Sequence, residues 1–382
     1  MSKILAIKSI YPIYRSGDNK FRIGAQMGVS VEINDHNNEF WDLCHLLNGD
    51  MNIDEVIKNM KVKHAKLSDQ DVLDGIKQLD NLNFMEELRS NEFDDNSSPL
   101  YRYEGNVNYF GHFCSIEDDK ADIQRQLLKS RVLLLGLGGI GSNILPLLAS
   151  AGVGNITCVD YDSVEVSNLN RQYLFNEADI GRLKCDVAQE HISSFNSNIK
   201  IQAINRKITS TDDIDELIFN TDVVICAIDE PPFIAQRLVN HVSVKYGIPC
   251  VYGLTQLTAG RVFTVLPNVS GCFDCLNIYY TKQDPQFLGQ LFGFREAKFN
   301  PPTLTFGPDI MQLAAIMASE VIRVITGYIP PSSIGRQVEH NFVDHSTKVL
   351  TEWPRYENEC PTCGKGNEID WDVFGFYESA PA

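Results

Sequence analysis

The chain has 382 residues, 43% of them hydrophobic, which allows two or three domains with a sizeable core. No stretch approaches the roughly 20 apolar residues of a membrane helix, and the N-terminus lacks a signal-peptide layout. A net charge of −17 disfavours phosphate backbones as ligands. We therefore expect a cytoplasmic protein with neither a nucleic-acid nor a membrane partner.

Residues 1–90 show extended segments followed by three short helical patterns. The segment "FRIGAQMGVSVEIN" predicts strands, and its end, Val29–Asn34, is a candidate edge for binding an added peptide strand. The pattern "EFWDLCHLLNG" predicts a helix that ends at Gly49 as its C-cap. Two more helices follow, the last with Ser68 and Asp69 as candidate N-caps. Strands followed by three small helices predict a winged-helix-type module.

The stretch "RSNEFDDNSSPLYRYEG" (Arg89–Gly105) is polar and carries turn formers, and we expect a linker over residues 91–117. Strands and helices then alternate, which predicts a parallel sheet with helices on both faces. The expected α/β fold is doubly wound and Rossmann-like, spans residues 118–366 and leaves 367–382 as a tail. Within it, "PCVYGLTQ" and "GRVFTVLP" predict an antiparallel pair of strands, and the end of the chain is rich in loops.

The stretch "LLLGLGGIGSN" is a nucleotide-binding fingerprint. Gly136, Gly138 and Gly141 fit the spacing GxGxxG, and Gly139 lies in the same turn, between a strand and a helix expected over 139–151. Asp160 ends the next strand, 19 residues after Gly141, a distance suited to holding ribose hydroxyls. This pattern fits NAD and ATP equally well.

The segment "DYDSVEVSNLNRQYLF" separates the two nucleotides. It places Asn168, Arg171 and Gln172 soon after Asp160, which suits ribose and phosphate oxygens better than a nicotinamide. Lys184, at the start of a helix expected to reach Phe195, adds a second positive charge for a triphosphate. The alternative for Arg171 and Lys184 is a pair of solvated surface charges.

Asp229 ends the apolar strand "DVVICAID". Ligands of open parallel sheets lie beyond the carboxyl ends of the strands, and a carboxylate there can hold Mg²⁺ against a triphosphate. A helix N-cap is the alternative role for this side chain. Attack by a carboxylate on the α-phosphate needs positive charge rather than a general base.

Ten cysteines include two CxxC pairs, "CFDC" and "CPTC". Two such pairs fit a closed tetrahedral zinc site that would clasp the tail to the sheet domain. The four expected ligands are Cys272, Cys275, Cys360 and Cys363. Cys185, beside Lys184, is a candidate catalytic thiol, but a structural role is the simpler interpretation.

Together, "GLGGIGSN", "SNLNRQ", Lys184, Asp229 and the twin CxxC pairs resemble the ubiquitin-activating-type (ThiF/MoeB-like) adenylating enzymes. The resemblance implies ATP, Mg²⁺ and Zn²⁺ as cofactors, Asp160 on the ribose, and Asp229 on magnesium. It implies Asn168, Arg171 and Lys184 on the phosphates, and a homodimer.

The N-terminal module makes the layout similar to the peptide-modifying branch, the microcin C and pantocin A biosynthetic enzymes, in which such a domain binds the leader of a ribosomal precursor peptide. In "YRYEGN", Arg102 lies where that branch carries an arginine-rich motif, whereas Glu104 and Gly105 stand where a second Arg is expected.

The expected activity is therefore ATP-dependent adenylation of a peptide carboxylate, either a C-terminus or a Glu or Asp side chain, in antibiotic biosynthesis. Activation of a sulfur carrier protein, as in thiamine and molybdopterin synthesis, is one alternative. An inactive peptide-binding partner protein is another, and an NAD-dependent dehydrogenase is the remotest.

Overall fold

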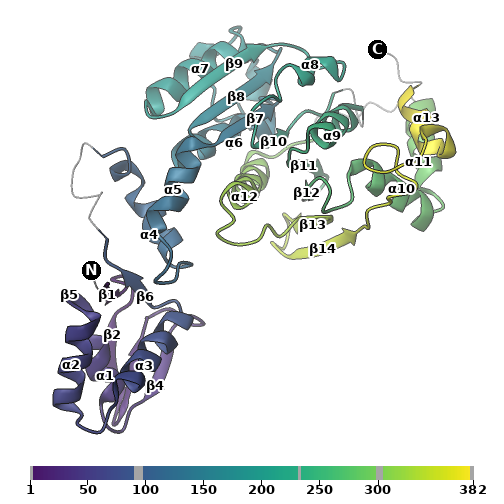
Figure 1. Ribbon diagram of the computed structural model, residues 1–382. Helices are drawn as coiled ribbons and strands as arrows, with labels where there is room; N and C mark the ends of the chain where they lie inside the picture. The colour runs from purple at the N-terminus through teal and green to yellow at the C-terminus, as the bar shows by residue number, and fades with distance from the viewer. Residues whose placement is uncertain (1–2, 90–97, 231–233, 298–303, 379–382) are drawn as a thin grey trace. The chain divides into compact units, whose positions relative to one another are not determined.

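The computed structural model describes residues 3–89, 98–230, 234–297 and 304–378 (Figure 1). The chain divides into two compact units, Met1–Arg125 and Gln126–Ala382. Helix α5 (Lys120–Lys129) crosses the boundary between them.

Within the N-terminal unit, residues 3–89 form two small antiparallel sheets and the three helices that the sequence predicts. One sheet has the strand order β2-β3-β4 and the other β5-β1-β6. The strands are β1 (Ile4–Ile7), β2 (Ile13–Gly17), β3 (Lys20–Ile23), β4 (Val31–Asn34), β5 (Asn48–Asn52) and β6 (Met85–Glu87), and the helices are α1 (Glu39–Leu46), α2 (Ile53–Lys63) and α3 (Asp69–Asn81). Their apolar faces share one core, in which Phe21, Ile23, Leu47 and Met85 are completely or almost completely buried.

Side-chain caps set the starts of two of these helices. As predicted, Ser68 caps α3, where its hydroxyl accepts the N–H of Asp71 and the Asp71 carboxylate accepts the N–H of Ser68. The predicted C-cap at Gly49 is wrong. Helix α1 ends earlier, at cap residue Leu47, and Gly49 lies in strand β5 with a φ of +89°. A positive φ suits glycine in a strand bulge as well as in a helix cap.

The segment predicted as a linker contains local helical structure. Residues Tyr101–Tyr103 form the 3-10 helix η1, and Glu104–Gly111 form α4. The buried ammonium of Lys8 donates to the carbonyls of Asn83 and Cys114, each at 2.6 Å, and ties this segment to the strands and helices before it. Burial lowers the pKa of Lys8.

The C-terminal unit is built on an eight-stranded mixed sheet in the order β14-β13-β12-β11-β10-β7-β8-β9. Strands β9, β8, β7, β10 and β11 are parallel, and β12, β13 and β14 continue the sheet as antiparallel neighbours. The strands are β7 (Arg131–Leu135), β8 (Asn155–Asp160), β9 (Lys200–Asn205), β10 (Val223–Cys226), β11 (Cys250–Gln256), β12 (Ala259–Val265), β13 (Arg336–Asn341) and β14 (Thr347–Glu352).

Helices cover both faces of this sheet, which confirms the doubly wound α/β fold (Figure 1). Helices α6, α7 and α12 contact one another or the strands on one side, and α8, α9 and α10 pack together with the core on the other. The helices are α6 (Gly139–Ala151), α7 (Lys184–Phe195), α8 (Asp212–Asp215), α9 (Ile234–Tyr246), α10 (Phe273–Gln283), α11 (Phe287–Glu296), α12 (Gly307–Thr326) and α13 (Asp372–Glu378).

The end of the chain is more regular than the sequence predicts. The expected loop-rich region contains strands β13 and β14, which extend the sheet beyond β12. Their sequences, "RQVEHN" and "TKVLTE", alternate polar and apolar residues only weakly, so they give little strand signal. Of the helices that the structure describes, none is both long and apolar enough to span a bilayer.

Candidate functional site

The glycine turn after β7 is shaped by close backbone packing. Gly136 has a φ of +98°, and a Cβ there would lie 2.5 Å from the Ala227 carbonyl oxygen. A Cβ on Gly141 would lie 1.9 Å from the carbonyl oxygen of Gly136. Both positions therefore require glycine.

Gly138 differs, because a Cβ there would meet nothing within 4 Å. Gly138 therefore borders open space at the N-terminus of α6, and no side chain caps this helix end. The backbone N–H groups of this first turn are thus suited to binding an anion.

Asp160 holds the turn from the end of the neighbouring parallel strand β8. Its Oδ2 accepts the N–H of Leu137 at 2.6 Å, and its Oδ1 accepts the N–H of Asp162 at 2.8 Å. Burial raises the pKa of Asp160, although the charge of Lys184 and these two bonds act in the opposite direction. The carboxylate is therefore fixed at the carboxyl edge of the sheet, as a ribose ligand must be.

Arg171 lies beside the glycine turn. The position of a Cβ on Gly139 would be 3.6 Å from its Cδ and Nε. Its Nη1 donates to the Ser167 carbonyl at 2.8 Å and to Asn170 Oδ1 at 2.9 Å, whereas no bond from Nε or Nη2 is found among the described residues. Asn143 joins the two segments, because its Nδ2 donates to the carbonyls of Gly139 and Arg171.

Lys184 is almost fully buried at the start of α7 and pairs with Asp162, with 2.8 Å between Nζ and Oδ2. Asp229 lies three residues beyond the end of β10, at the same edge of the sheet. Although much of Asp229 is exposed, desolvation raises its pKa, and the nearby carboxylates of Glu230 and Asp162 raise it further. The site thus places one buried cation among several carboxylates.

Asn168 and Gln172 differ in how the protein already uses them. The Asn168 side chain is buried, and its Oδ1 accepts the N–H of Glu165 at 3.1 Å, so this oxygen serves the local turn. Gln172 is also buried, and its Oε1 has no hydrogen-bond partner among the described residues.

The four paired cysteines converge although they come from distant parts of the chain. Their sulfur atoms all lie within 4.8 Å of one another, with 3.5 Å between Cys272 and Cys360 and 3.3 Å between Cys275 and Cys363. Zinc–sulfur bonds of about 2.3 Å in a tetrahedron require sulfur atoms roughly 3.8 Å apart, so the cluster fits Zn²⁺ closely. Among the described residues, this is the one group of His, Cys, Asp or Glu side chains close enough to hold a metal by themselves.

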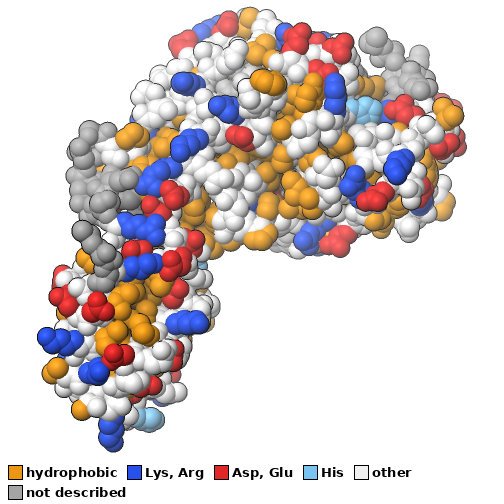
Figure 2. Space-filling model, in the orientation of Figure 1, with side chains coloured by type: hydrophobic (Ala, Val, Ile, Leu, Met, Phe, Trp, Pro, Cys, Tyr) orange, Lys and Arg blue, Asp and Glu red, His pale blue; other side chains and the backbone are white. Residues whose placement is uncertain are grey.

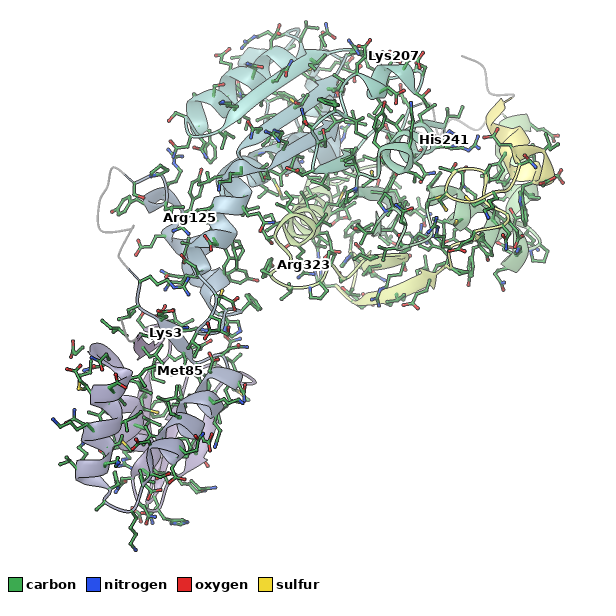
Figure 3. The ribbon with its side chains drawn as sticks, viewed as in Figure 1. Lys3, Met85, Arg125, Lys207, His241 and Arg323 are labelled. Atoms are coloured by element: carbon green, nitrogen blue, oxygen red, sulfur yellow. The ribbon has the colours of Figure 1, made fainter. Side chains whose placement is uncertain are left out.

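A buried ion-pair network supports the cysteine cluster. Asp274, between the first two cysteines, accepts Arg237 Nε at 3.1 Å and the hydroxyl of Thr362, between the last two, at 2.6 Å. His241 on α9, labelled in Figure 3, lies 3.4 Å away, and Arg237 also pairs with Glu368. Burial alone would raise the pKa of Asp274, but the His241 contact and the Arg237 charge hold it below its usual value.

Cys185 is buried, and its thiol contacts the carbonyls of Asp160 and Ile204 at 3.3 and 3.2 Å. Burial raises its pKa to about 11, so the thiol remains protonated at neutral pH. This environment supports the structural interpretation of Cys185 rather than a nucleophile.

Sequence reasoning missed several residues that complete these sites. Asp162 and Asn143 lie inside the quoted motifs, but only the fold reveals their bonds to Lys184 and to the glycine turn. Arg237 and Asp274 gave no separate signal, because they lie 37 residues apart and pair only in three dimensions.

The fold defines an α/β protein whose candidate nucleotide site lies at the carboxyl ends of β7, β8 and β10. The ThiF family model matches residues 112–362, and the chain belongs to the ThiF family. The sulfur carrier protein adenylyltransferase of Thermus thermophilus is 31% identical over 260 residues, which cover 66% of this chain and 90% of that protein. The Escherichia coli ThiS adenylyltransferase is 28% identical over 253 residues, which cover 66% and 93%.

Solved structures match almost the whole chain. E. coli MccB with AMPCPP and MccA superposes with a TM-score of 0.75 at 22% identity, covering 95% of this chain and 100% of that one. MccB with ATP gives a TM-score of 0.75 at 21% identity, covering 94% and 99%. PaaA superposes with a TM-score of 0.68 at 21% identity, covering 91% of this chain and 99% of the PaaA chain.

The predicted relationship to ThiF/MoeB-like enzymes is thereby confirmed, as is the enzyme class. The chain is an ATP-dependent adenylyltransferase.

Proposed function

We propose that this enzyme adenylates a carboxylate of a ribosomally made precursor peptide and releases pyrophosphate, as a step in peptide antibiotic biosynthesis. One observation carries the proposal. The family model begins at residue 112, whereas the MccB fold covers 95% of the chain, including its N-terminal unit. In one solved structure, the microcin C7 biosynthetic enzyme MccB is in complex with N-formylated MccA, and we extend this kind of ligand, a precursor peptide, to this chain.

In the proposed reaction, a carboxylate oxygen of the peptide attacks the α-phosphorus of ATP. The bond between that phosphorus and the bridging oxygen to the β-phosphate breaks, and pyrophosphate leaves with the electron pair. The product is an acyl adenylate, in which AMP is a good leaving group for a later nucleophile. No proton has to be removed, because the carboxylate is ionised at neutral pH.

The assigned residues bring two anions together and stabilise their charge. Arg171 has an unused edge of its guanidinium for phosphate oxygens, and the α6 N-terminus supplies backbone donors. Lys184, whose Nζ lies 2.8 Å from Asp162 Oδ2, would add a second positive charge on the phosphates. Asp160 would bind the ribose, and Asn168 and Gln172 would complete the nucleotide site.

Asp229 is the proposed magnesium ligand. Because Mg²⁺ usually takes one or two protein carboxylates and completes its shell with water and phosphate oxygens, a single Asp near Asp162 is a sufficient protein contribution. The ion would neutralise charge on the leaving pyrophosphate. Zn²⁺ in the four-cysteine cluster would be structural, since four thiolates leave no open coordination position.

Two partners follow from this proposal. The first is the precursor, whose leader would bind to the N-terminal unit. The second is another copy of the chain, because Val166, Tyr173 and Phe306 expose 70%, 53% and 65% of their surface near Arg171. Apolar patches bordered by charged residues, of the kind visible in Figure 2, commonly form interfaces.

The second candidate function is activation of a sulfur carrier protein, favoured by the 31% identity to the Thermus adenylyltransferase. The test is ATP–pyrophosphate exchange with two alternative substrates, a short peptide encoded beside the gene and a sulfur carrier protein. Hydroxylamine traps the adenylate as a hydroxamate, which mass spectrometry locates at the C-terminus or on a side chain. Exchange with the carrier alone would establish the second function and refute the first.

A further inference from the structure

A cavity of about 580 Å³ opens beside Asp229 and extends away from the nucleotide site. Asp229 is therefore shared between the proposed magnesium position and this cavity. Its volume falls within the range of small-ligand pockets, about 300–1,000 Å³. Its walls come from the four neighbouring strands β11, β12, β13 and β14 and from helices α9, α10 and α11.

The described lining is mainly apolar. The side chains that make it so are Leu254, Phe273, Leu276, Phe287, Leu291 and Leu350. The one cation among the described lining residues is Arg261, and it is already paired with Glu339, with 2.9 Å between Nε and Oε2. Tyr280 is likewise engaged, since its hydroxyl donates to Gln337 at 2.7 Å.

The remaining charges oppose a second anion. Asp284 lines the cavity and is paired with no cation among the described residues; Asp229 also lines it and is the proposed magnesium ligand. An acidic side chain placed there would lose its hydration and meet negative charge. A basic side chain would be attracted by Asp284, which is exposed, but it would have to leave water for an apolar lining.

We propose that this cavity selects a bulky, uncharged side chain next to the carboxylate that is adenylated. The inference rests on the proposed function, because the position of Asp229 relates the cavity to the reacting carboxylate. For a C-terminal carboxylate, the selected side chain belongs to the last residue of the peptide. Gln236 adds an acceptor for the substrate backbone, since its Nε2 donates to the Ile228 carbonyl and its buried Oε1 accepts no bond among the described residues.

The closing experiment has a turnover arm and a binding arm. The turnover arm compares precursor peptides that differ only in a last residue of Leu, Phe, Asp or Lys, in ATP–pyrophosphate exchange. We expect kcat/KM for Leu and Phe to exceed that for Asp and Lys at least tenfold. The binding arm measures acetyl-phenylalanine methylamide and acetyl-lysine methylamide by saturation-transfer NMR, with no carboxylate and no ATP present.

Two neighbouring variants on β14 provide the matched pair. Leu350→Arg places a cation in the cavity and should abolish binding of the phenylalanine amide and raise the relative rate of the Asp-ended peptide. Val349→Arg is the control, because Val349 is 47% exposed and does not line the cavity.

The two arms separate the possible failures. Equal rates for all four peptides, or no difference in amide binding between the two variants, would overturn the cavity proposal while leaving peptide adenylation intact. Amide binding that is lost only in Leu350→Arg, together with no turnover of any peptide, would support the cavity and refute the proposed function.

Discussion

Replacing Arg171 by alanine tests the assignment of this residue to the phosphates. The guanidinium carries five N–H donors, and Nη1 uses its two on Ser167 and Asn170. The Nε and Nη2 edge, beside Gly139, is left for a bidentate contact with phosphate oxygens.

The size of the effect follows from that geometry. Removing one preorganised donor to a developing negative charge typically costs about 3 kcal/mol. At 1.36 kcal/mol per factor of ten, Arg171→Ala should lower kcat/KM roughly 150-fold. The kcat/KM of Arg171→Lys should lie between those of the native enzyme and Arg171→Ala, because an ammonium keeps the charge but cannot make a bidentate contact with phosphate oxygens.

The assay is ATP–pyrophosphate exchange with a saturating peptide, and circular dichroism checks the fold. Arg182→Ala is the control, because Arg182 is exposed and its partners are the buried Asp179 and the exposed Glu190 rather than the glycine turn. A loss smaller than tenfold for Arg171→Ala, or an equal loss in the control, would refute the phosphate role.

Three further predictions follow from the structure. Asp229→Asn should abolish exchange, and at neutral pH it should leave the free energy of unfolding unchanged or higher. The sign follows from the raised pKa of Asp229, because its carboxyl keeps its proton to a higher pH in the folded state than in the unfolded chain. Ionisation of Asp229 therefore lowers the free energy of unfolding as the pH rises from the unfolded to the folded pKa. Clear destabilisation of Asp229→Asn in urea melts would contradict this. One zinc per chain should be found by metal analysis, and Cys363→Ser should lose it, whereas Cys185→Ala should keep both zinc and activity; a zinc-free native protein purified without chelator would contradict the site. Glu32→Pro should weaken binding of a labelled leader at least tenfold while Glu32→Ala does not, because proline removes a backbone N–H that an added strand would use. The Asp35 N–H points toward β3, so strand alternation turns the Glu32 N–H toward the unpaired edge of β4. Equal affinities of the two variants would place the leader elsewhere.

The sequence predicts the nucleotide-binding half of the fold well, because its signals are local. Helices α6 and α7 begin and end where their patterns predict, since Gly138 and Gly152 bound the first and Leu183 and Asn196 the second. The antiparallel pairing of β11 with β12 was also predicted correctly, from two apolar strands joined by a short turn.

Interactions between distant segments could not be predicted in the same way. Strand β13 is polar in sequence and becomes a strand only through pairing with β12 and β14. Lys184 was identified as a cation, but its partner Asp162 depends on how the loop after β8 folds back. The cavity beside Asp229 is lined by residues from seven helices and strands, so no local sequence motif indicates it.

The central claim is that a peptide carboxylate attacks the α-phosphorus of ATP. The most direct measurement uses a precursor peptide labelled with ¹⁸O in its carboxylates, followed by mass spectrometry of the released nucleotide. Adenylation and breakdown of the acyl adenylate predict AMP with one ¹⁸O atom and unlabelled pyrophosphate. Unlabelled AMP, or ADP with ¹⁸O in inorganic phosphate, would contradict attack at the α-phosphorus.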